Sequence, residues 1–140
     1  MKLTRRESMV LRFIFEALGK TPIVGVKQVA EFLGVSLPSA HELLSRLTKE
    51  KGLLMRVERK GYTLSKHGEA VARKIVAAHR VLEVVFHVVF GMDADNACNM
   101  ATYVDYLISQ EYVINAFKHL GCPECCPHNK RIPIGGDSCE

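Results

Sequence analysis

The sequence predicts a mostly α-helical fold, in which a winged helix-turn-helix domain is followed by a small helical domain. Three features of the 140 residues lead to this prediction. Two apolar-periodic segments flank a short turn between residues 26 and 49, two β-prone runs flank a basic turn between residues 53 and 64, and neither Gly nor Pro occurs from Glu69 to Phe90. Such patterns are typical of a helical hairpin, a β-hairpin and one long helix, respectively.

The first helix is expected to span Arg5 to Leu18, because Gly19 and Pro22 then interrupt the helical pattern. Its apolar side chains fall close to one stripe, so this stripe should face the core. The stripe comprises Met9, Phe13, Ile14 and Ala17. A second, shorter helix should follow and end at Gly34.

A third helix should begin behind the polar cap candidates Ser36 and Ser39, with Pro38 near its first turn. Apolar side chains recur along it at i, i+3, i+4 and i+7, so one face packs inward through Ala40, Leu43, Leu44 and Leu47. Hydroxyl, imidazole, acidic and basic side chains occupy the opposite face, which suits contacts with base edges and phosphates in a DNA major groove. The residues expected to face the groove are Ser36, Pro38, Ser39, His41, Glu42 and Arg46.

Two β-prone runs, residues 53–58 and 62–64, should pair as a hairpin around a basic turn that contains a glycine. We expect Arg59 and Lys60 in this turn to contact the DNA backbone or the adjacent minor groove. Two simpler interpretations are a helical hairpin with a solvated charged face and a winged helix that binds protein. Charge favours double-stranded DNA, because residues 1–80 hold 16 Lys and Arg against 7 Asp and Glu, whereas residues 81–140 hold 3 against 8.

One long helix should begin after Ser65, a natural N-cap, and continue to the glycine at position 91. Its second half is apolar on too many faces for a surface helix, so other helices or a second copy of the chain must cover it. Two shorter helices should follow, over residues 93–107 and 109–120, the first with an apolar face formed by Met100, Tyr103, Val104 and Leu107. Because they make a thin core, we expect homodimerisation, which recognition of a palindromic operator also requires.

No segment is expected to direct the chain into a membrane. The basic N-terminus precedes an amphipathic pattern and not an uninterrupted apolar stretch. The most apolar run, residues 81–90, is short and is interrupted by Glu83 and His87. We therefore expect a cytoplasmic protein with no membrane partner, whose five cysteines are thiols or metal ligands in preference to disulfides.

Three polar side chains share one side of the long helix, because His79, Glu83 and His87 are spaced i, i+4 and i+8. A histidine and a carboxylate one turn apart can share a divalent cation, with imidazole suiting iron, zinc or nickel. The alternative is a hydrogen-bonded histidine of the core or of an interface.

The C-terminal tail offers a separate set of metal ligands, with four Cys and one His within eighteen positions: Cys122, Cys125, Cys126, His128 and Cys139. Zinc takes four sulfur or nitrogen ligands, so zinc is expected first. An iron–sulfur cluster is the alternative, and a tail of unligated thiols is a third interpretation. The C-x-x-C pair also suggests a thiol–disulfide enzyme, but no βαβ pattern surrounds it, so we expect no enzymatic activity.

The winged helix, the long helix with His79-Arg80-Val81-Leu82-Glu83, the following Ala97-Cys98 and the tail Cys126-Pro127-His128 before Ile132-Pro133 together resemble the diphtheria toxin repressor family of metal-dependent regulators. The resemblance covers nearly the whole chain. It implies a homodimeric repressor that binds operator DNA when Fe(II) or Mn(II) occupies paired sites between the DNA-binding and dimerisation domains. It further implies that Met9 and Cys98 belong to a primary metal site, and His79 and Glu83 to an ancillary one.

The chain departs from the family's pattern around that cysteine. The family usually has Glu and His three and four residues after it, where this chain has Ala101 and Thr102. The other ancillary His, four residues before the cysteine, is Ala94 here. A thioether and one thiolate are a soft and incomplete ligand set for Fe(II) or Mn(II). The expected cofactor is therefore a divalent transition metal, zinc or iron, with manganese possible.

The sequence predicts three segments. Residues 1–72 should form the winged-helix DNA-binding domain, residues 73–121 the helical dimerisation and metal-sensing domain, and residues 122–140 a Cys-rich tail. The predicted function is that of a metal-dependent homodimeric repressor of transcription. A winged-helix regulator that senses redox state or carries an iron–sulfur cluster is the alternative.

Overall fold

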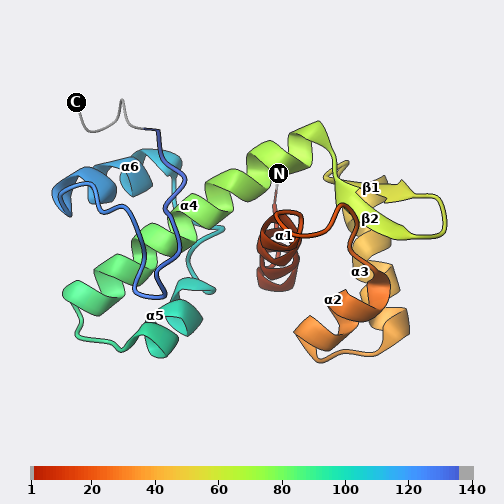
Figure 1. Ribbon diagram of the computed structural model, residues 1–140, viewed down its shortest axis with the longest axis horizontal. Helices are drawn as coiled ribbons and strands as arrows, with labels where there is room; N and C mark the ends of the chain where they lie inside the picture. Colours follow the sequence, from red (N-terminus) through yellow and green to blue (C-terminus); the bar gives the residue numbers. More distant parts are fainter. Residues whose placement is uncertain (1, 136–140) are drawn as a thin grey trace. The chain divides into compact units, whose positions relative to one another are not determined.

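The computed structural model describes residues 2–135, which form two compact units, one that ends at Ala72 and one that begins at Arg73. The elements follow one another along the chain as shown in Figure 1: α1 (Arg5–Ala17), α2 (Val26–Leu33), α3 (Leu37–Lys49), β1 (Leu54–Val57), β2 (Gly61–Leu64), α4 (Lys66–Val88), α5 (Ala94–Ala101) and α6 (Gln110–His119). Within residues 2–135, none of the helices has the length and apolar character needed to span a membrane.

The helix-turn-helix is confirmed, and α3 buries its whole predicted apolar face, Ala40, Leu43, Leu44 and Leu47. Ser36 caps this helix, because its hydroxyl accepts a hydrogen bond from the Ser39 N–H at 3.3 Å. Gly34 ends α2 with a φ of 67°, a left-handed conformation that glycine adopts without steric cost. The turn between the two helices therefore follows from local sequence signals.

α1 buries one residue of the predicted stripe, Ile14, and otherwise a neighbouring stripe. Its buried residues are Glu7, Ser8, Val10, Leu11 and Ile14, whereas Met9 and Phe13 are only half-buried. Phe13 instead stacks on Phe32 of α2, with ring centroids 4.3 Å apart. The prediction was right for Ile14 and wrong for the rest of the stripe, because two neighbouring stripes of this helix are apolar and the polar residues at positions 7 and 8 concealed the buried one.

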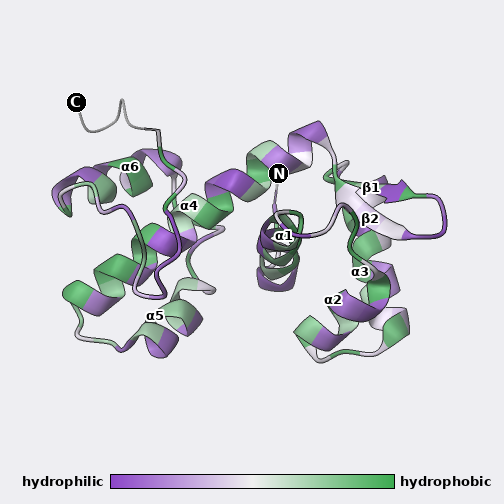
Figure 2. Cartoon of the chain, in the orientation of Figure 1, coloured by the Kyte–Doolittle hydropathy of each residue, from purple (hydrophilic) through white to green (hydrophobic). Residues whose placement is uncertain are grey.

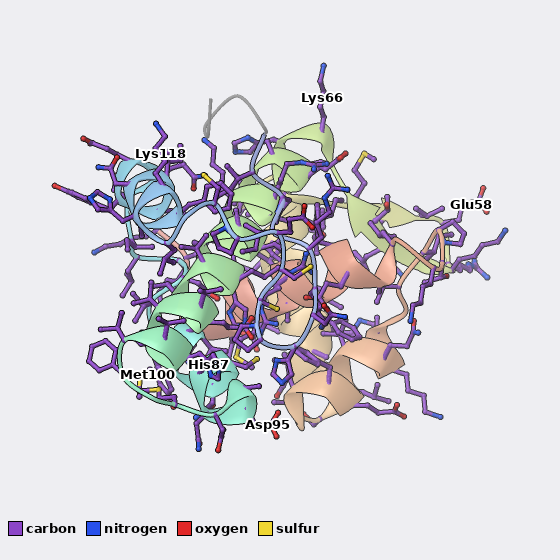
Figure 3. The ribbon with its side chains drawn as sticks, turned by 60° about the vertical axis from the view of Figure 1, so that its left-hand side comes forward. Glu58, Lys66, His87, Asp95, Met100 and Lys118 are labelled. Atoms are coloured by element: carbon purple, nitrogen blue, oxygen red, sulfur yellow. The ribbon has the colours of Figure 1, made fainter. Side chains whose placement is uncertain are left out.

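β1 and β2 form an antiparallel hairpin in which Leu54 pairs with Leu64 and Val57 with Gly61. Val24 extends this sheet by one bridge, since its N–H and carbonyl both bond to Tyr62, at 2.9 and 2.8 Å. The turn of the hairpin is hydrophilic (Figure 2), and Glu58 lies at its tip (Figure 3). The predicted wing is thus present, with Arg59 and Lys60 exposed on its turn.

Gly68 allows the first turn of α4 to pack directly on the backbone that precedes β1. A Cβ at this position would overlap the carbonyl oxygen of Leu53 and lie 2.7 Å from its carbonyl carbon. Because these are backbone atoms, they cannot rotate away. We expect Gly68→Ala to lower the free energy of unfolding by about 2 kcal/mol or more, which urea denaturation will measure. Gly135→Ala, where no atom lies within 4 Å, is the control, and an equally stable Gly68→Ala variant would contradict this packing.

The second unit has its core where α4, α6 and the C-terminal segment meet. The buried residues of this core are Ala78, Val81, Val84, Val113, Phe117 and Ile132. We call residues 122–135 the strap; it runs along α4 between α5 and α6 (Figure 1). Arg80 of α4 donates a hydrogen bond to the carbonyl of Arg131. This hydrogen bond and the burial of Ile132 in the core together hold the strap against α4.

α5 is shorter than the helix predicted for residues 93–107. Asp93 caps it as expected, accepting from the Asn96 N–H at 2.8 Å, but the helix ends at Ala101. Thr102 then bonds back to the Asn99 carbonyl through both its N–H and its hydroxyl, and the backbone continues in turns. A threonine hydroxyl that competes for backbone carbonyls favours this early end.

The predicted apolar face of that segment does not pack inside the chain. Met100, Tyr103 and Leu107 are exposed, as are Val88, Val89, Phe90 and Tyr112. Ala97 and Ala101 are the buried apolar residues of α5. The large apolar side chains of this region therefore face outward, and the small ones allow α5 to lie close to its neighbours.

Candidate DNA interface and metal centre

The predicted DNA-contacting residues of α3 lie at its start and along its outer face. Ser36, Pro38, Ser39, His41 and Glu42 are exposed, and Arg46 is half-buried. A cavity of about 520 Å³ opens beside them, lined by Thr4, Arg5, Arg6, Ser39, Glu42, Leu43 and Arg46. Arg5 and Arg6 thus place two basic side chains next to the predicted reading face. This basic pair stands at the start of the first helix in the sequence, but it was not predicted to contact DNA.

A second cavity, of about 380 Å³, lies between α3 and the wing. It is lined by His41, Glu42, Ser45, Thr48, Lys49, Arg56 and Tyr62. Lys49 and Arg56 bring positive charge to this cavity from the helix and from the strand. Basic side chains from α3 and from the hairpin therefore line one cavity, a position that suits contacts with phosphates.

A buried carboxylate anchors the helix that carries Arg46. Glu7 is fully buried, and the Lys51 ammonium lies 2.8 and 2.9 Å from its two oxygens. Burial raises the pKa of Glu7, but hydrogen bonds from Lys51 and Thr4 outweigh burial and hold this pKa below its ordinary value. Glu7 is therefore ionised, and its Oε2 lies 3.8 Å from the Arg46 guanidinium. The Thr4-x-x-Glu7 capping box was the available sequence signal.

In the second unit, His79, Glu83 and Cys98 converge, with one ligand atom from each lying within 4.8 Å of the others. His79 Nε2 is 3.1 Å from Glu83 Oε1 and 3.4 Å from Cys98 Sγ. His79 and Glu83 come from successive turns of α4 and are buried, and Cys98 comes from α5. One nitrogen, one oxygen and one sulfur donor fit a divalent transition cation.

Asp105 orients the His79 ring from the other side. His79 Nδ1 lies 2.9 Å from the buried Asp105 Oδ2. With a cation bound at the cluster, Nδ1 would donate its hydrogen to Asp105, and Nε2, the nitrogen that faces Glu83 and Cys98, would be the metal-binding atom. Metal-ligating histidines commonly donate their second N–H to such a carboxylate. Asp105 was not among the predicted site residues, and no spacing pattern links it to His79.

His128 of the strap lies against the same cluster. Its Nδ1 is 3.1 Å from Glu83 Oε2, and its Nε2 is 2.8 Å from Asp95 Oδ1. The hydrogen bond to Asp95 raises the pKa of His128; burial opposes this, and Glu83 raises it further. For Glu83, by contrast, burial raises the pKa, but His79 and His128 outweigh burial and bring it below its ordinary value. Glu83 is therefore an ionised carboxylate between two imidazoles.

The structure groups the predicted ligands differently from the resemblance. Cys98 lies with His79 and Glu83, whereas the resemblance implied one site for Met9 and Cys98 and another for His79 and Glu83. Met9 is half-buried on α1, in the first unit. His87, one turn beyond Glu83, is exposed and bonds to the Met92 carbonyl at 2.7 Å, where it helps to end α4.

The tail cysteines do not form a ligand group within the part of the chain that the structure describes. Cys122 is disulfide-bonded, which differs from the expectation of thiols or metal ligands, and Cys125 and Cys126 are free thiols. Cys126 is buried, and burial raises the pKa of its thiol. Cys139 lies outside the described residues, so the predicted tail site stays a prediction.

Two family descriptions match consecutive parts of the chain. Residues 2–62 match the iron dependent repressor, N-terminal DNA binding domain, and residues 65–134 match the iron dependent repressor, metal binding and dimerisation domain. An uncharacterized HTH-type transcriptional regulator of Aeropyrum pernix is 30% identical over 105 residues, which cover 75% of this chain and 57% of that protein.

Solved structures agree with these matches. The hypothetical protein SSo2273 from Sulfolobus solfataricus is 32% identical with a TM-score of 0.72, and the match covers 94% of this chain and 100% of that one. The manganese regulator SloR is 28% identical with a TM-score of 0.81, covering 97% of this chain and 62% of that one. The chain therefore spans less than two thirds of the length of the Aeropyrum protein and of the manganese regulator.

Proposed function

This chain belongs to the iron-dependent repressor family, and we propose that it is a metal-dependent transcriptional repressor that binds a palindromic operator as a homodimer. The observation that carries the proposal is the convergence of His79, Glu83 and Cys98 in the part that matches the family's metal-binding and dimerisation domain. This donor set suits zinc or iron better than manganese, because the thiol sulfur is a soft ligand.

We assign DNA binding to residues 1–72, dimerisation and metal sensing to residues 73–121, and a Cys-rich tail to residues 122–140. The exposed polar side chains at the start of α3 would meet base edges, which carry the sequence information. Arg46 and the exposed Arg59 and Lys60 would meet phosphates, which fix the position of the protein on the duplex.

A cation bound at the cluster would supply a link between α4 and α5. His79 is oriented for this role by Asp105, and Glu83 is ionised and buried beside it. Metal can control DNA binding only if the cation binds more tightly to the conformation that binds DNA. The proposal therefore predicts a coupling between metal and DNA, and this coupling can be measured.

We expect Zn(II) or Fe(II) to strengthen binding to a duplex selected from a random library by at least about tenfold, a typical coupling between two sites. Fluorescence anisotropy with and without metal will measure it. His79→Ala should remove the response and leave the metal-free affinity unchanged. His119→Ala, whose ring bonds only to the nearby Asn115 carbonyl among the contacts described, is the control. Equal affinity with and without metal would contradict the proposal.

Exposed apolar side chains support the homodimer. Val88, Val89 and Phe90 are consecutive and each about two-thirds exposed, and Leu107 is 70% exposed. Soluble monomers rarely expose extended apolar patches. We expect sedimentation at micromolar concentration to give a dimer, and Val89→Asp to give a monomer with much weaker operator binding. Met55→Asp, an exposed position on the wing, is the control for assembly, and a stable wild-type monomer would remove the basis for palindromic recognition.

A regulator of the same fold that senses redox state or holds an iron–sulfur cluster is the alternative from the sequence. It draws on the tail cysteines, of which Cys125 and Cys126 are free thiols. Because Cys139 lies outside the described residues, this alternative stays a prediction and is not part of the proposed function.

A further inference from the structure

We infer that Leu37, the first residue of α3, reads a thymine in each half of the operator by packing against its C5-methyl group. This inference rests on the proposed function and adds a specificity-determining residue that was not among the predicted DNA contacts. Leu37 is 51% exposed, although leucine is usually buried in a folded domain. A single exposed leucine is ordinary on most surfaces, so its place on the helix that meets DNA carries the argument.

The first turn of α3 projects from the first unit. Residues 36–39 are all exposed, and Ala40 is the first buried residue of the helix. The helical period places Leu37 in line with Ala40, Leu44 and Leu47, each of which is fully buried. Leu37 thus continues the inward stripe by its spacing, but it lies one turn beyond the part that the core covers. About half of its surface is therefore available to a partner outside the chain.

This turn is the part of a helix-turn-helix that meets base edges. The second helix of the motif enters the major groove, and its N-terminal residues contact the bases. Leu37 directly follows the cap residue Ser36, so it belongs to that part of α3. Water leaves this turn when a duplex binds. If Leu37 then faced a base nitrogen or oxygen, that atom would lose its hydrogen bond to water and gain none, which would lower the affinity by about 5- to 150-fold.

Thymine offers the apolar group that avoids this loss. Its C5-methyl is the apolar group that the bases present in the major groove, whereas the other groups there are hydrogen-bond donors and acceptors. Packing Leu37 on this methyl group removes apolar surface of both partners from water and leaves no polar base atom unpaired. The exposed leucine therefore favours thymine at one position of each half-site. Uracil differs from thymine by that methyl group alone, so the contact can be tested by a change of a single group.

The test is a uracil scan of a duplex that the full chain, with Zn(II), selects from a random library. Each thymine of one half-site and its counterpart in the other are replaced in turn by deoxyuridine, and fluorescence anisotropy measures the affinity. We expect one position at which uracil weakens binding by about fourfold per half-site, or about 15-fold for the pair, the value for one methyl group. Leu37→Ala should bind the thymine duplex at least that much more weakly. It should also lose the difference between thymine and uracil, at this position alone.

Two variants serve as comparisons. Met55→Ala is the matched control, because Met55 is also apolar and 51% exposed but lies on β1, and it should keep the full uracil effect. Pro38→Ala tests the exposed apolar neighbour of Leu37. Alanine favours helices, so Leu37→Ala should keep the wild-type fold. A uracil effect that persists in Leu37→Ala, or that disappears in Pro38→Ala instead, would overturn the inference.

The salt dependence distinguishes a base contact from a phosphate contact. Leu37→Ala should keep the wild-type slope of affinity against salt, because it removes no charge from the interface. A shallower slope would show that the variant displaces phosphate contacts, and it would overturn the assignment to a base. If the wild type binds its selected duplex in a metal-dependent manner but no thymine responds in the scan, the proposed function stands and only the role of Leu37 falls. A wild-type chain that selects no sequence from the library would overturn both.

Discussion

Raising the salt concentration from about 50 to 200 mM is expected to weaken operator binding by about 10⁴-fold. Each subunit presents Arg46, Lys49, Arg59 and Lys60 on α3 and the wing, so a dimer would make about eight phosphate contacts. The logarithm of affinity then falls with the logarithm of salt at a slope of about −7, because each neutralised phosphate releases condensed counterions. Anisotropy titrations at several salt concentrations will give this slope.

The wing accounts for half of that expected slope. Replacing Arg59 and Lys60 by alanine removes about four contacts from a dimer, so the slope should become shallower by about 3.6. A variant with Lys20→Ala and Lys118→Ala changes the net charge equally at exposed positions outside α3 and the wing, and it should keep the original slope. If the wing variant kept both affinity and slope, Arg59 and Lys60 would lie outside the interface.

The helix-turn-helix and the wing were predictable because their signals are local. Ser36, Pro38 and Gly34 set the ends of two helices within a few residues, and the buried face of α3 follows from its period. The end of α5 was not predictable from period alone. There, Thr102 bonds to the preceding turn and ends the helix, although the apolar pattern continues to Leu107.

The metal centre was predictable only in part, because sequence spacing indicates contacts within one helix but not contacts between segments that are distant in the sequence. His79 and Glu83 lie one turn apart on one helix, so their spacing shows that they can share a cation. Asp105 and His128 reach these residues across 26 and 45 positions of sequence, through the placement of a turn and of the strap. Cys98 was recognised as a ligand, but the packing of α5 on α4 determines which residues it joins.

The second large loss of stability is expected when the buried ion pair between Lys51 and Glu7 is broken. Lys51→Met should lower the free energy of unfolding by about 3 kcal/mol or more, because it leaves the ionised Glu7 buried without its closest cation. Lys51→Met combined with Glu7→Gln should recover much of this loss, since the buried charge is then removed with its partner. Urea denaturation of the four proteins forms a double-mutant cycle, and additive effects would contradict a direct pair.

The dependence of stability on pH gives an independent test of the same carboxylate. The pKa of Glu7 is lower in the folded chain than in the unfolded chain, so its ionised form stabilises the fold fully at pH values above its ordinary pKa of about 4.3. That stabilisation is lost as the pH falls through the lowered folded pKa, where Glu7 takes up a proton. Glu7→Gln should therefore lose stability at neutral pH and show a flatter profile at acidic pH than the wild type. Because Glu7 lies beside Arg46 and is buried, the same variant should weaken operator binding more than Glu42→Gln, whose carboxylate lies at a similar distance from Arg46 but is exposed to solvent. Equal DNA affinities for the two variants would show that Glu7 stabilises the fold without positioning Arg46.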